Sequence, residues 1–276
     1  MARLQRGPGS RHDKRENSVS PIDPAAGLLA LFFRFAKGLL FILLGRSDER
    51  YMKLKSRLVL WSARLGFYEA EIYREIPRLL KAGDVAVDAG ANCGVYTRRF
   101  LDCVGAEGHV YAFEPNPLYL PFLESFAQKT PSVLAVMAEA VGQSPSRSFL
   151  KIPRITGGAP EPALAHLVSE KGLENLEVSV VTLDERLASL QRLDLLKIDI
   201  EGGEALAILG ALSLLRKFHP VVVVESADKD ALAHLLEQNG LEYAGRVKNA
   251  WRKLRYVAPR PDATYILFWK SPGELT

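Results

Sequence analysis

From residue 84 onward, short apolar runs alternate with segments in which apolar residues recur at helical spacing. The apolar runs are predicted to be strands at 84–89, 108–114, 132–138, 193–200, 219–226, 241–247 and 263–269. Helical patterns lie between most of these runs, at about 68–82, 95–104, 117–129, 203–217 and 229–239. Apolar runs bounded by helices are typical of a parallel sheet that is buried on both faces, so the pattern predicts an α/β fold.

One segment, 143–182, interrupts this alternation. It is rich in proline and glycine and ends in the alternating run Leu176–Thr182, which is typical of a half-buried strand. We interpret 143–182 as an insertion near the mouth of the active site, either a short antiparallel excursion or a lid.

The N-terminal residues lie outside the alternating pattern. Residues 1–24 are polar and basic, with several glycines and prolines, and are predicted to form a disordered arm. Residues 25–44 form an apolar run long enough to cross a bilayer, but Arg34 and Lys37 stand near its centre. The apolar side chains contribute about −4 to −7 kcal/mol to insertion and the two bases cost about 5 to 7 kcal/mol, so the energy does not decide whether the run spans a membrane.

Helical geometry favours a helix that lies in the membrane interface. The small and basic residues of 25–44 share one helical stripe, the rest of the surface is apolar, and bases flank the run on both sides. A spanning helix and a helix docked on the soluble domain are the alternatives. The predicted organisation is therefore the arm 1–24, a hydrophobic or amphipathic helical segment 25–65 with a candidate membrane contact at 25–44, and a main domain 66–276.

Charge and cysteine content narrow the partners and the compartment. Residues 1–20 hold five bases against two acids, which is +3 of the net charge of +4, so the body of the protein is nearly neutral and no nucleic-acid-binding face is indicated. The two cysteines, Cys93 and Cys103, form no C-x-x-C pair, and the helix expected between them keeps them too far apart for a disulfide. We expect a cytoplasmic protein, either free or at the inner face of a membrane.

The run Val85–Thr97 joins a buried strand to Asp88 and then to a turn with the spacing G-x-x-x-G, formed by Gly90 and Gly94. Such a turn lets a ligand approach the backbone and opens a helix with free N–H groups, which suits nucleotide-like cofactors. A dinucleotide site carries G-x-G-x-x-G around a pyrophosphate. Asp88 would repel a pyrophosphate, whereas it suits a cationic ligand such as S-adenosylmethionine, which carries an amino group and a sulfonium.

A second acidic strand end follows at Glu114, before Pro115 and Asn116. A carboxylate at the tip of the second strand can accept both hydroxyls of a ribose. The ribose role alone fits an NAD enzyme equally well, but the pairing with Asp88 favours S-adenosylmethionine. The alternative is that both acids are solvated strand ends and the glycines are ordinary turn residues.

The run Leu195–Glu204 gives a third strand end, with carboxylates at Asp199 and Glu201. Ligands of open α/β sheets bind at the carboxyl ends of strands, so both acids are expected to face the same crevice as Asp88 and Glu114. They could act as the general base for a substrate hydroxyl or hydrogen-bond that hydroxyl. Alternatively, Asp199 binds the cofactor's amino group or caps the next helix, or the pair holds a divalent cation.

Three further side chains are weaker candidates. Glu225 ends the next strand and either lines the acceptor pocket or is a plain strand-end carboxylate. Thr97 is expected to bond local backbone or the cofactor's carboxylate, and His166 is a candidate mobile base whose alternative is a surface residue. The histidines are scattered and no metal site is predicted from their spacing.

At these positions the chain resembles the FkbM family of S-adenosylmethionine-dependent methyltransferases. The resemblance extends over roughly residues 66–270 and follows the family's order of motifs. The blocks that carry it are Val87–Thr97, Phe113–Asn116, Ala140–Gly142, Val181–Asp184, Leu196–Glu204 and His219–Glu225. The block around Asp199 is specific in combination with the glycine turn, whereas either alone is weak. The membrane-like segment 25–44 lies outside the resemblance.

The resemblance implies a Rossmann-like class I methyltransferase fold, with a seven-stranded, mostly parallel sheet, an antiparallel last strand and helices on both faces. The N-terminal hydrophobic helix that we expect before this fold comes from the apolar pattern of 25–44 and not from the resemblance. It implies that the glycine turn surrounds the methionine part of the cofactor and that Glu114 holds the ribose. Family members often carry a polar residue where Ala138 stands, so backbone groups or Glu139 are left to recognise the adenine. The full set of expected cofactor contacts is Asp88, Gly90, Asn92, Gly94, Thr97, Glu114, Pro115, Asn116, Glu139, Ala140 and Asp199.

The function expected is methyl transfer from S-adenosylmethionine to a hydroxyl oxygen of a sugar, glycolipid or polyketide-type acceptor. Asp199 or Glu201 would supply the base, and a membrane-lying helix at 25–44 would bring the site to a lipid-linked acceptor. Two other classes compete with this hypothesis: an NAD-dependent oxidoreductase, and a membrane-tethered binding protein on a degenerate methyltransferase fold. The acceptor and the oligomeric state are not predicted.

Overall fold

The computed structural model describes residues 35–65, 70–155, 157–226, 229–241, 245–247 and 265–269. Its main sheet has the strand order β10-β11-β9-β8-β1-β2-β3. The strands are β1 (Val85–Ala89), β2 (His109–Phe113), β3 (Leu134–Met137), β8 (Leu195–Ile198), β9 (Val221–Ser226), β10 (Gly245–Val247) and β11 (Tyr265–Trp269). Neighbouring strands from β3 to β9 are parallel, whereas β11 is antiparallel to both β9 and β10. The predicted α/β fold on a parallel sheet is confirmed.

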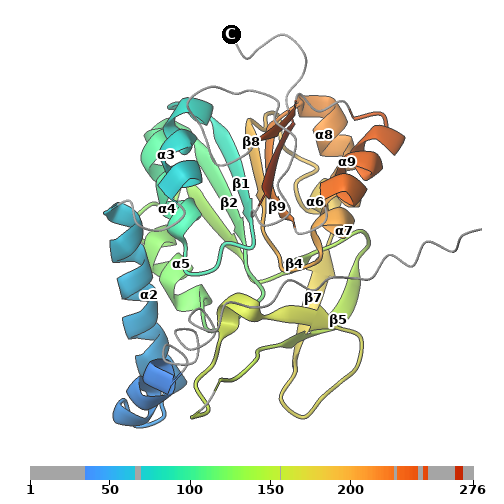
Figure 1. Ribbon diagram of the computed structural model, residues 1–276. Helices are drawn as coiled ribbons and strands as arrows, with labels where there is room; N and C mark the ends of the chain where they lie inside the picture. Colours follow the sequence, from blue (N-terminus) through green and yellow to red (C-terminus); the bar gives the residue numbers. More distant parts are fainter. Residues whose placement is uncertain are drawn as a thin grey trace, which may run out of the picture.

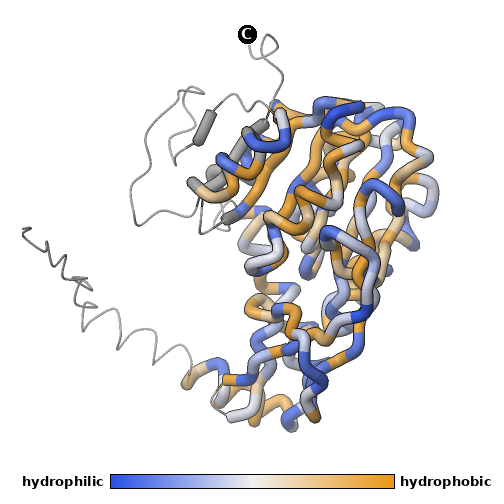
Figure 2. The backbone as a smooth tube through the Cα atoms, turned by 90° about the vertical axis from the view of Figure 1, so that its right-hand side faces the viewer, coloured by the Kyte–Doolittle hydropathy of each residue, from blue (hydrophilic) through white to orange (hydrophobic). Residues whose placement is uncertain are grey.

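Helices cover both faces of this sheet (Figure 1). One face carries α3 (Ala70–Leu79), α4 (Val95–Val104) and α5 (Leu120–Ala127); the other carries α6 (Leu183–Arg186), α7 (Glu204–Leu209), α8 (Leu212–Phe218) and α9 (Lys229–Gln238). Two apolar cores result, because successive side chains of β1 point to opposite faces of the sheet. Ala86 belongs to the core on the face covered by α3, α4 and α5, and Val87 to the core on the other face. Figure 2 shows the apolar residues concentrated in the strands between the helices.

The prediction of one helix over 203–217 is wrong, because the chain forms two helices there, α7 and α8. The break falls at Gly210, where an added Cβ would lie 2.0 Å from the carbonyl oxygen of Gly142. A second helix starts because the carboxylate of Asp184 accepts hydrogen bonds of 2.9 Å from the backbone N–H groups of Ser213 and Leu214. This cap comes from a distant part of the chain, so helical periodicity alone could not reveal it.

The insertion 143–182 contributes most of a second, smaller sheet, with the order β4-β7-β5-β6. Its strands are β4 (Ala140–Val141), β5 (Ser146–Lys151), β6 (His166–Val168) and β7 (Leu176–Val181). Strand β5 is antiparallel to both β6 and β7, as expected for an antiparallel excursion. Two short 3-10 helices are η1 (Gly105–Glu107) and η2 (Pro162–Leu164), the latter inside the insertion.

The described part of the N-terminal segment forms two helices that pack on the domain. Residues 35–43 are helical, and after a turn at 44–46 the helix α2 (Asp48–Arg64) starts at Ser47, whose hydroxyl accepts a hydrogen bond from the backbone N–H of Arg50. Phe41 is buried and lies edge-on to Tyr51 of α2. The arm 1–24 and residues 25–34 lie outside the described residues. Among the residues that are described, no helix is both long and apolar enough to cross a membrane.

If 25–44 formed a helix in the membrane interface, the Lys37 side chain would be expected at the lipid headgroups. The structure places it elsewhere. The Lys37 ammonium lies 2.7 Å from the carboxylate of Glu161 in the insertion, and Lys55 of α2 binds the same carboxylate. Glu161 is buried. The two helices and the insertion are therefore held to each other by one buried acid that binds a base from each helix.

Candidate functional site

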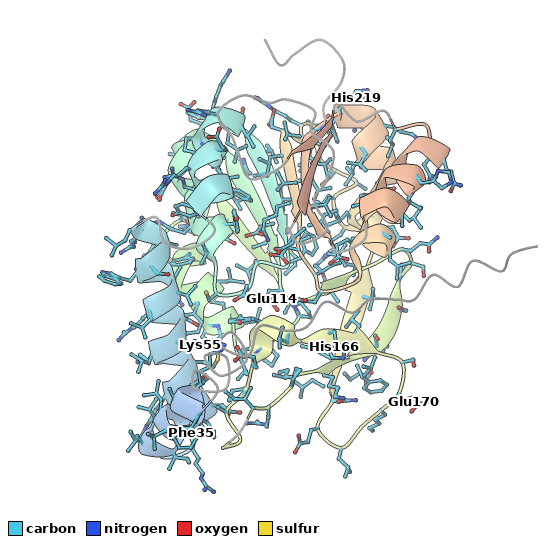
Figure 3. All side chains as sticks on the ribbon, in the orientation of Figure 1. Phe35, Lys55, Glu114, His166, Glu170 and His219 are labelled. Carbon is cyan, nitrogen blue, oxygen red and sulfur yellow. The ribbon has the colours of Figure 1, made fainter. Side chains whose placement is uncertain are left out.

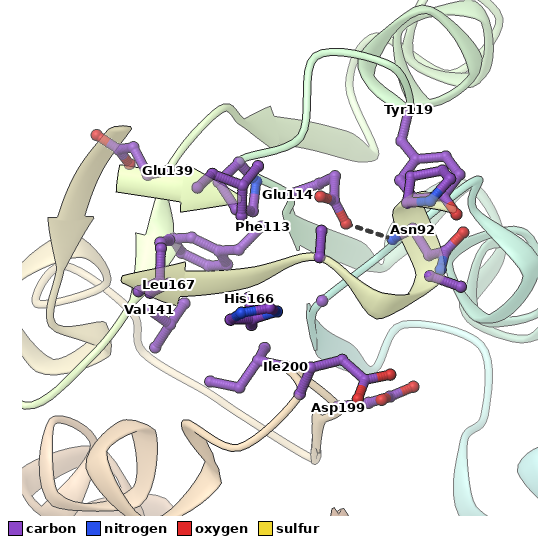
Figure 4. A pocket seen from close by; sticks show the side chains of 18 of the residues that line it. Asn92, Phe113, Glu114, Tyr119, Glu139, Val141, His166, Leu167, Asp199 and Ile200 are labelled. Carbon is purple, nitrogen blue, oxygen red and sulfur yellow. Dashed lines mark hydrogen bonds between the residues drawn. The ribbon is translucent and has the colours of Figure 1, made fainter. Parts of the chain in front are cut away.

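The site lies where the strand order of the main sheet reverses. Strand β1 has β2 on one side and β8 on the other, and the chain leaves these strands in opposite directions across the sheet. Ligands of open α/β sheets bind at the carboxyl ends of strands at such a point. A pocket of about 200 Å³ opens there (Figure 4). Figure 3 labels Glu114 at the lower end of the main sheet and His166 on the second sheet below it.

The turn after β1 is built for close backbone approach. Gly90 has φ +80°, and an added Cβ would lie 1.8 Å from the carbonyl oxygen of Asp199 on the neighbouring strand end. Gly94 has φ +87° and precedes α4, with the ring of Phe126 where its Cβ would stand. Asn92 also has a positive φ, which asparagine tolerates better than most residues. Both glycines of the predicted motif therefore have a steric reason to be glycine.

Glu114 follows β2 and fastens the turn to that strand. Its two carboxylate oxygens accept hydrogen bonds from the backbone N–H groups of Asn92, at 2.7 Å, and Asn116, at 2.8 Å. The first of these bonds is drawn in Figure 4. Burial raises the pKa of Glu114 to about 7, although both backbone hydrogen bonds act in the opposite direction. Glu114 also lines the pocket.

Asp88 lies behind the pocket rather than on its wall. It is fully buried, and its Oδ2 accepts a hydrogen bond of 2.6 Å from the hydroxyl of Thr97. Its Oδ1 lies 3.4 Å from the ammonium of Lys197. Burial raises the pKa of Asp88, whereas Lys197 and Thr97 lower it. Four of the predicted cofactor residues are absent from the described pocket lining: Asp88, Gly94, Thr97 and Asn116.

Lys197 is a residue of the site that sequence reasoning missed. It pairs in register with Asp88 across β1 and β8, and it is almost completely buried. Its ammonium lies 3.1 Å from the carboxylate of Asp199 and 4.8 Å from the centre of the Tyr96 ring. A single lysine in the middle of an apolar strand was the available signal, because a buried base needs an acidic partner.

The acids after β8 reach the pocket, as the strand-end argument expects. Asp199 and Glu201 both line it, and the backbone of Asp199 is tied to β1 by a hydrogen bond from its N–H to the carbonyl of Ala89. Glu201 has φ +53°, which is strained for a glutamate and turns the chain sharply after the strand. Burial, Asp199 and Glu204 raise the pKa of Glu201, whereas His166 lowers it.

The remaining candidates are also found on the pocket wall. Pro115, Glu139, Ala140, His166 and Glu225 line it. His166 stands at the start of β6, and its Nδ1 lies 3.1 Å from the carbonyl oxygen of Leu164 (Figure 4). The sequence left His166 between a mobile base and a surface residue, and the structure puts it in the pocket. Tyr119 lines the pocket as well and was not a candidate.

The pocket is strongly acidic. Among the described residues that line it, five carry carboxylates and none is a lysine or an arginine. Glu139 accepts a hydrogen bond of 2.8 Å from Arg186, and Lys197 approaches Asp199 from behind. The other lining groups are apolar, amide, phenol or imidazole. Such a wall favours a cationic ligand and disfavours a pyrophosphate.

A second cavity of about 400 Å³ adjoins the first and shares Glu201, Ile200, Leu167 and Val141 with it. The rest of its wall comes from the strands of the second sheet and the loops beside them, and from the start of α7 with the turn before it. It carries four serines: Ser144, Ser146, Ser148 and Ser169. Glu201 therefore stands between an acidic pocket and a cavity rich in hydroxyls. No group of three or more histidine, cysteine, aspartate or glutamate side chains that could hold a metal ion is found in the described part of the chain.

Solved structures offer a first comparison. The methyltransferase FkbM from Methylobacillus flagellatus KT is 16% identical, with a TM-score of 0.44; the match covers 67% of this chain and 43% of that one. A fibrillarin from Aeropyrum pernix, solved with natively bound S-adenosyl-L-methionine, is 12% identical over 70% of this chain and 68% of that one, with a TM-score of 0.42. A SAM-dependent methyltransferase from Aquifex aeolicus is 11% identical over 71% and 87%, with a TM-score of 0.40.

Sequence comparison identifies the family. No curated protein sequence matches the chain significantly. The model of the methyltransferase FkbM domain, however, matches residues 88–243, which is more than half of the 276 residues. The matched part begins at Asp88 in β1 and includes every lining residue named above. The chain therefore belongs to the FkbM family of methyltransferases.

Proposed function

We propose that the protein transfers the methyl group of S-adenosylmethionine to a hydroxyl oxygen of a polar acceptor. The acidic pocket at the reversal of the strand order carries this proposal. Five carboxylates and no lysine or arginine line its described wall, and the cofactor offers an ammonium and a sulfonium, both cationic. An NAD-dependent oxidoreductase would have to place a pyrophosphate against the same wall, so that alternative is disfavoured on electrostatic grounds.

The residues present fit the cofactor. Glu114 stands at the tip of the second strand with its carboxylate fixed by two backbone N–H groups, which suits the hydroxyls of a ribose. Gly90 leaves room where a side chain would collide with Asp199. Asp199 lines the pocket beside Gly90 and would bind the ammonium of the methionine part, with Lys197 holding its carboxylate in place. Glu139 and the backbone of Ala140 remain the candidates for the adenine.

The cofactor supplies an electrophilic methyl group when it is bound. The protein itself has two tasks: to hold the acceptor oxygen in line with that methyl group, and to take the proton of the hydroxyl. Glu201 is placed for the second task, since it stands between the two cavities and its pKa is raised. An oxygen–carbon bond forms, the carbon–sulfur bond breaks, and the proton goes to the Glu201 carboxylate. The products are a methyl ether and S-adenosylhomocysteine.

The adjoining cavity suits an acceptor with several hydroxyls. Its four serines can each donate and accept a hydrogen bond, and its remaining wall is largely apolar. A sugar, a glycolipid headgroup or a hydroxylated polyketide fits this description. These three acceptor classes share the chemistry that the cavity offers, namely a hydroxyl oxygen on a partly apolar frame.

Binding and transfer are tested separately. Calorimetry should show that the full-length protein binds S-adenosylmethionine and does not bind NAD; binding of NAD alone would contradict the proposal. Transfer of a labelled methyl group is then assayed with lipid, glycan and small-molecule extracts, and the labelled product is identified. A product labelled on nitrogen or carbon would overturn the assignment of an oxygen acceptor. Binding without transfer to any extract would favour the non-catalytic alternative.

The substitution Glu201→Gln tests the base. We expect kcat to fall by about 10²- to 10⁴-fold, because the proton acceptor is lost, while the affinity for S-adenosylmethionine stays nearly unchanged. Glu170→Gln is the control, since Glu170 is exposed on the insertion away from the pocket (Figure 3). An unchanged kcat in Glu201→Gln together with inactivity in Asp199→Asn would move the base to Asp199.

A further inference from the structure

The outer face of α2 has an unusual composition for a helix packed on a soluble domain. Four large apolar side chains are exposed on it: Leu54, Leu58, Trp61 and, at the C-cap, Leu65. Their spacing of four, three and four residues places them on one helical stripe. Trp61 is 61% exposed and Leu58 is 54% exposed, although the opposite face of the same helix is buried against the domain.

Four bases lie beside this stripe. Arg50, Lys53, Arg57 and Arg64 are all exposed, and at 100° per residue they fall on a second stripe that borders the apolar one. None of the four is paired with a carboxylate of a described residue. The two acids of the first turn, Asp48 and Glu49, lie outside both stripes. The two stripes together form the α2 outer face.

We propose that the α2 outer face binds the surface of an anionic lipid membrane. The apolar stripe would enter the boundary between headgroups and acyl chains, and the basic stripe would contact anionic headgroups. Trp61 is suited to that boundary, because its ring is apolar and its N–H is a hydrogen-bond donor. Charge complementarity decides among the occupants: a second copy of this chain would bring four bases against four bases.

The helix at 35–43 extends the same property. Phe35, Leu39, Ile42 and Leu43 are exposed on it, and Leu43 is 74% exposed. In Figure 1 this helix lies at one end of α2, and Figure 3 labels Phe35 there. Its buried side packs on the domain through Phe41, so its exposed apolar residues face outward rather than into the core.

The membrane-binding helices are also joined to the pocket. Glu161 is held by Lys37 and Lys55, and the next residues, Pro162 and Ala163, line the pocket. A membrane bound by α2 would therefore contact a helix that Glu161 joins to one wall of the site. The docking proposal does not depend on the proposed reaction, because vesicle binding requires no methyl transfer.

Sedimentation of the full-length protein with vesicles tests the proposal. We expect binding to vesicles of phosphatidylcholine with about one third phosphatidylglycerol, and much weaker binding to phosphatidylcholine alone or at high salt. The double substitution Leu58→Ser, Trp61→Ser should lower the partition coefficient by at least about tenfold. Lys53→Glu, Arg57→Glu should lower it by at least about tenfold on anionic vesicles only.

Leu173→Ser is the matched control. Leu173 is fully exposed and lies three residues from Glu170, which Figure 3 places away from α2, so binding should not change. All four positions changed in α2 are exposed, so the variants should fold, which circular dichroism checks. Trp61 fluorescence, identified by subtraction of a Trp61→Phe variant, should shift to the blue and be quenched by brominated lipid.

Three results would overturn the proposal. The first is no binding to anionic vesicles. The second is binding that the α2 variants leave unchanged, which would place the contact in another part of the chain. The third is a concentration-dependent dimer that the Leu58→Ser, Trp61→Ser variant abolishes, because the apolar stripe would then be covered by a second copy.

Discussion

At the residue scale, the site depends on a balance of buried charges. Asp88 and Lys197 face each other across β1 and β8, and Asp199 approaches the same ammonium from the strand end. Asp88 and Lys197 are buried at a cost that is recovered only through their partners, whereas Asp199 is partly exposed. The turn after β1 therefore rests on an ion-paired group of which Asp199 reaches the described pocket wall and Asp88 and Lys197 do not.

Removal of Lys197 tests this balance. We expect Lys197→Met to lower the free energy of unfolding by about 3 to 5 kcal/mol, because it leaves Asp88 without its base. The double variant Lys197→Met, Asp88→Asn should lose less free energy of unfolding than the losses of the two single variants added together. Urea denaturation measures all three losses. Lys171→Met, at an exposed position, is the control. Additive effects of the two single changes would show that Lys197 and Asp88 are not coupled.

The raised pKa of Glu114 predicts a pH-dependent affinity. Burial raises this pKa to about 7, so the carboxyl gains charge as the pH rises through neutrality. Ribose hydroxyls donate more strongly to a charged carboxylate, so the affinity for S-adenosylmethionine should increase between about pH 6 and pH 8. Calorimetry at several pH values measures this. Glu114→Gln should bind more weakly and show a flat profile; an unchanged slope would assign the titration to another group.

The same shift has an opposite consequence for stability. The pKa of Glu114 in the folded protein, about 7, is above its ordinary value of 4.5, so between these values the unfolded state binds fewer protons. The free energy of unfolding therefore decreases as the pH rises through this window. Affinity for the cofactor and stability of the free protein thus change in opposite directions around neutrality.

At the element scale, the turn between β1 and α4 is limited by space. Gly90 combines a positive φ with a backbone neighbour at its side-chain position, whereas Gly83 has a similar φ of +84° and nothing within 4 Å of an added Cβ. A comparison of the two positions therefore distinguishes the cost of backbone strain from the cost of a steric collision. The same element carries Asn92, whose backbone N–H joins the turn to β2 through Glu114.

The variants Gly83→Ala and Gly90→Ala make this comparison directly. Gly83→Ala should lower the free energy of unfolding by about 1 to 2 kcal/mol, from left-handed strain alone. Gly90→Ala should cost more than that and should also weaken cofactor binding, because the backbone of Asp199 must move. Denaturation and calorimetry measure the two effects. An equal loss of free energy of unfolding in both variants, with no loss of affinity in Gly90→Ala, would show that the collision at Gly90 is relieved at no cost.

At the scale of the whole molecule, Glu161 joins the N-terminal helices to the insertion. Burial raises its pKa, but hydrogen bonds from Lys37 and Lys55 outweigh burial, and the net pKa is lowered. A lowered pKa stabilises the folded state above the ordinary value of 4.5, and this stability is lost as the pH falls below it. The two N-terminal helices and one pocket wall thereby share a pH-sensitive contact.

Glu161→Gln should therefore lower the free energy of unfolding by about 1 to 3 kcal/mol at neutral pH, because two bases lose their partner. The loss should shrink as the pH is lowered below about 4, where the native acid is itself protonated. Glu177→Gln is the control, since its pair with Arg147 is exposed and should contribute less than about 1 kcal/mol. A constant loss at every pH would contradict the ionic origin of the contact.

The sequence by itself determined the strands of the parallel sheet and most of the helices between them, but not the division of 203–217 into α7 and α8. Apolar runs separated by helical patterns specify a covered parallel sheet because burial on both faces requires them. Carboxylates that follow such runs must lie at one edge of the sheet, so Glu114, Asp199, Glu201 and Glu225 could be assigned to one crevice. Local patterns suffice here because they show where each strand ends, and parallel strands end at the same edge of the sheet.

The tertiary structure alone decided which groups meet. Asp88 is turned to Lys197 behind the pocket, His166 is brought into it by the second sheet, and Glu161 collects a base from each N-terminal helix. The break at Gly210 follows from a distant backbone contact in the same way. These contacts join residues far apart in the chain, and nothing local in the sequence records them. They are set by how the layers pack, which is a property of the whole fold.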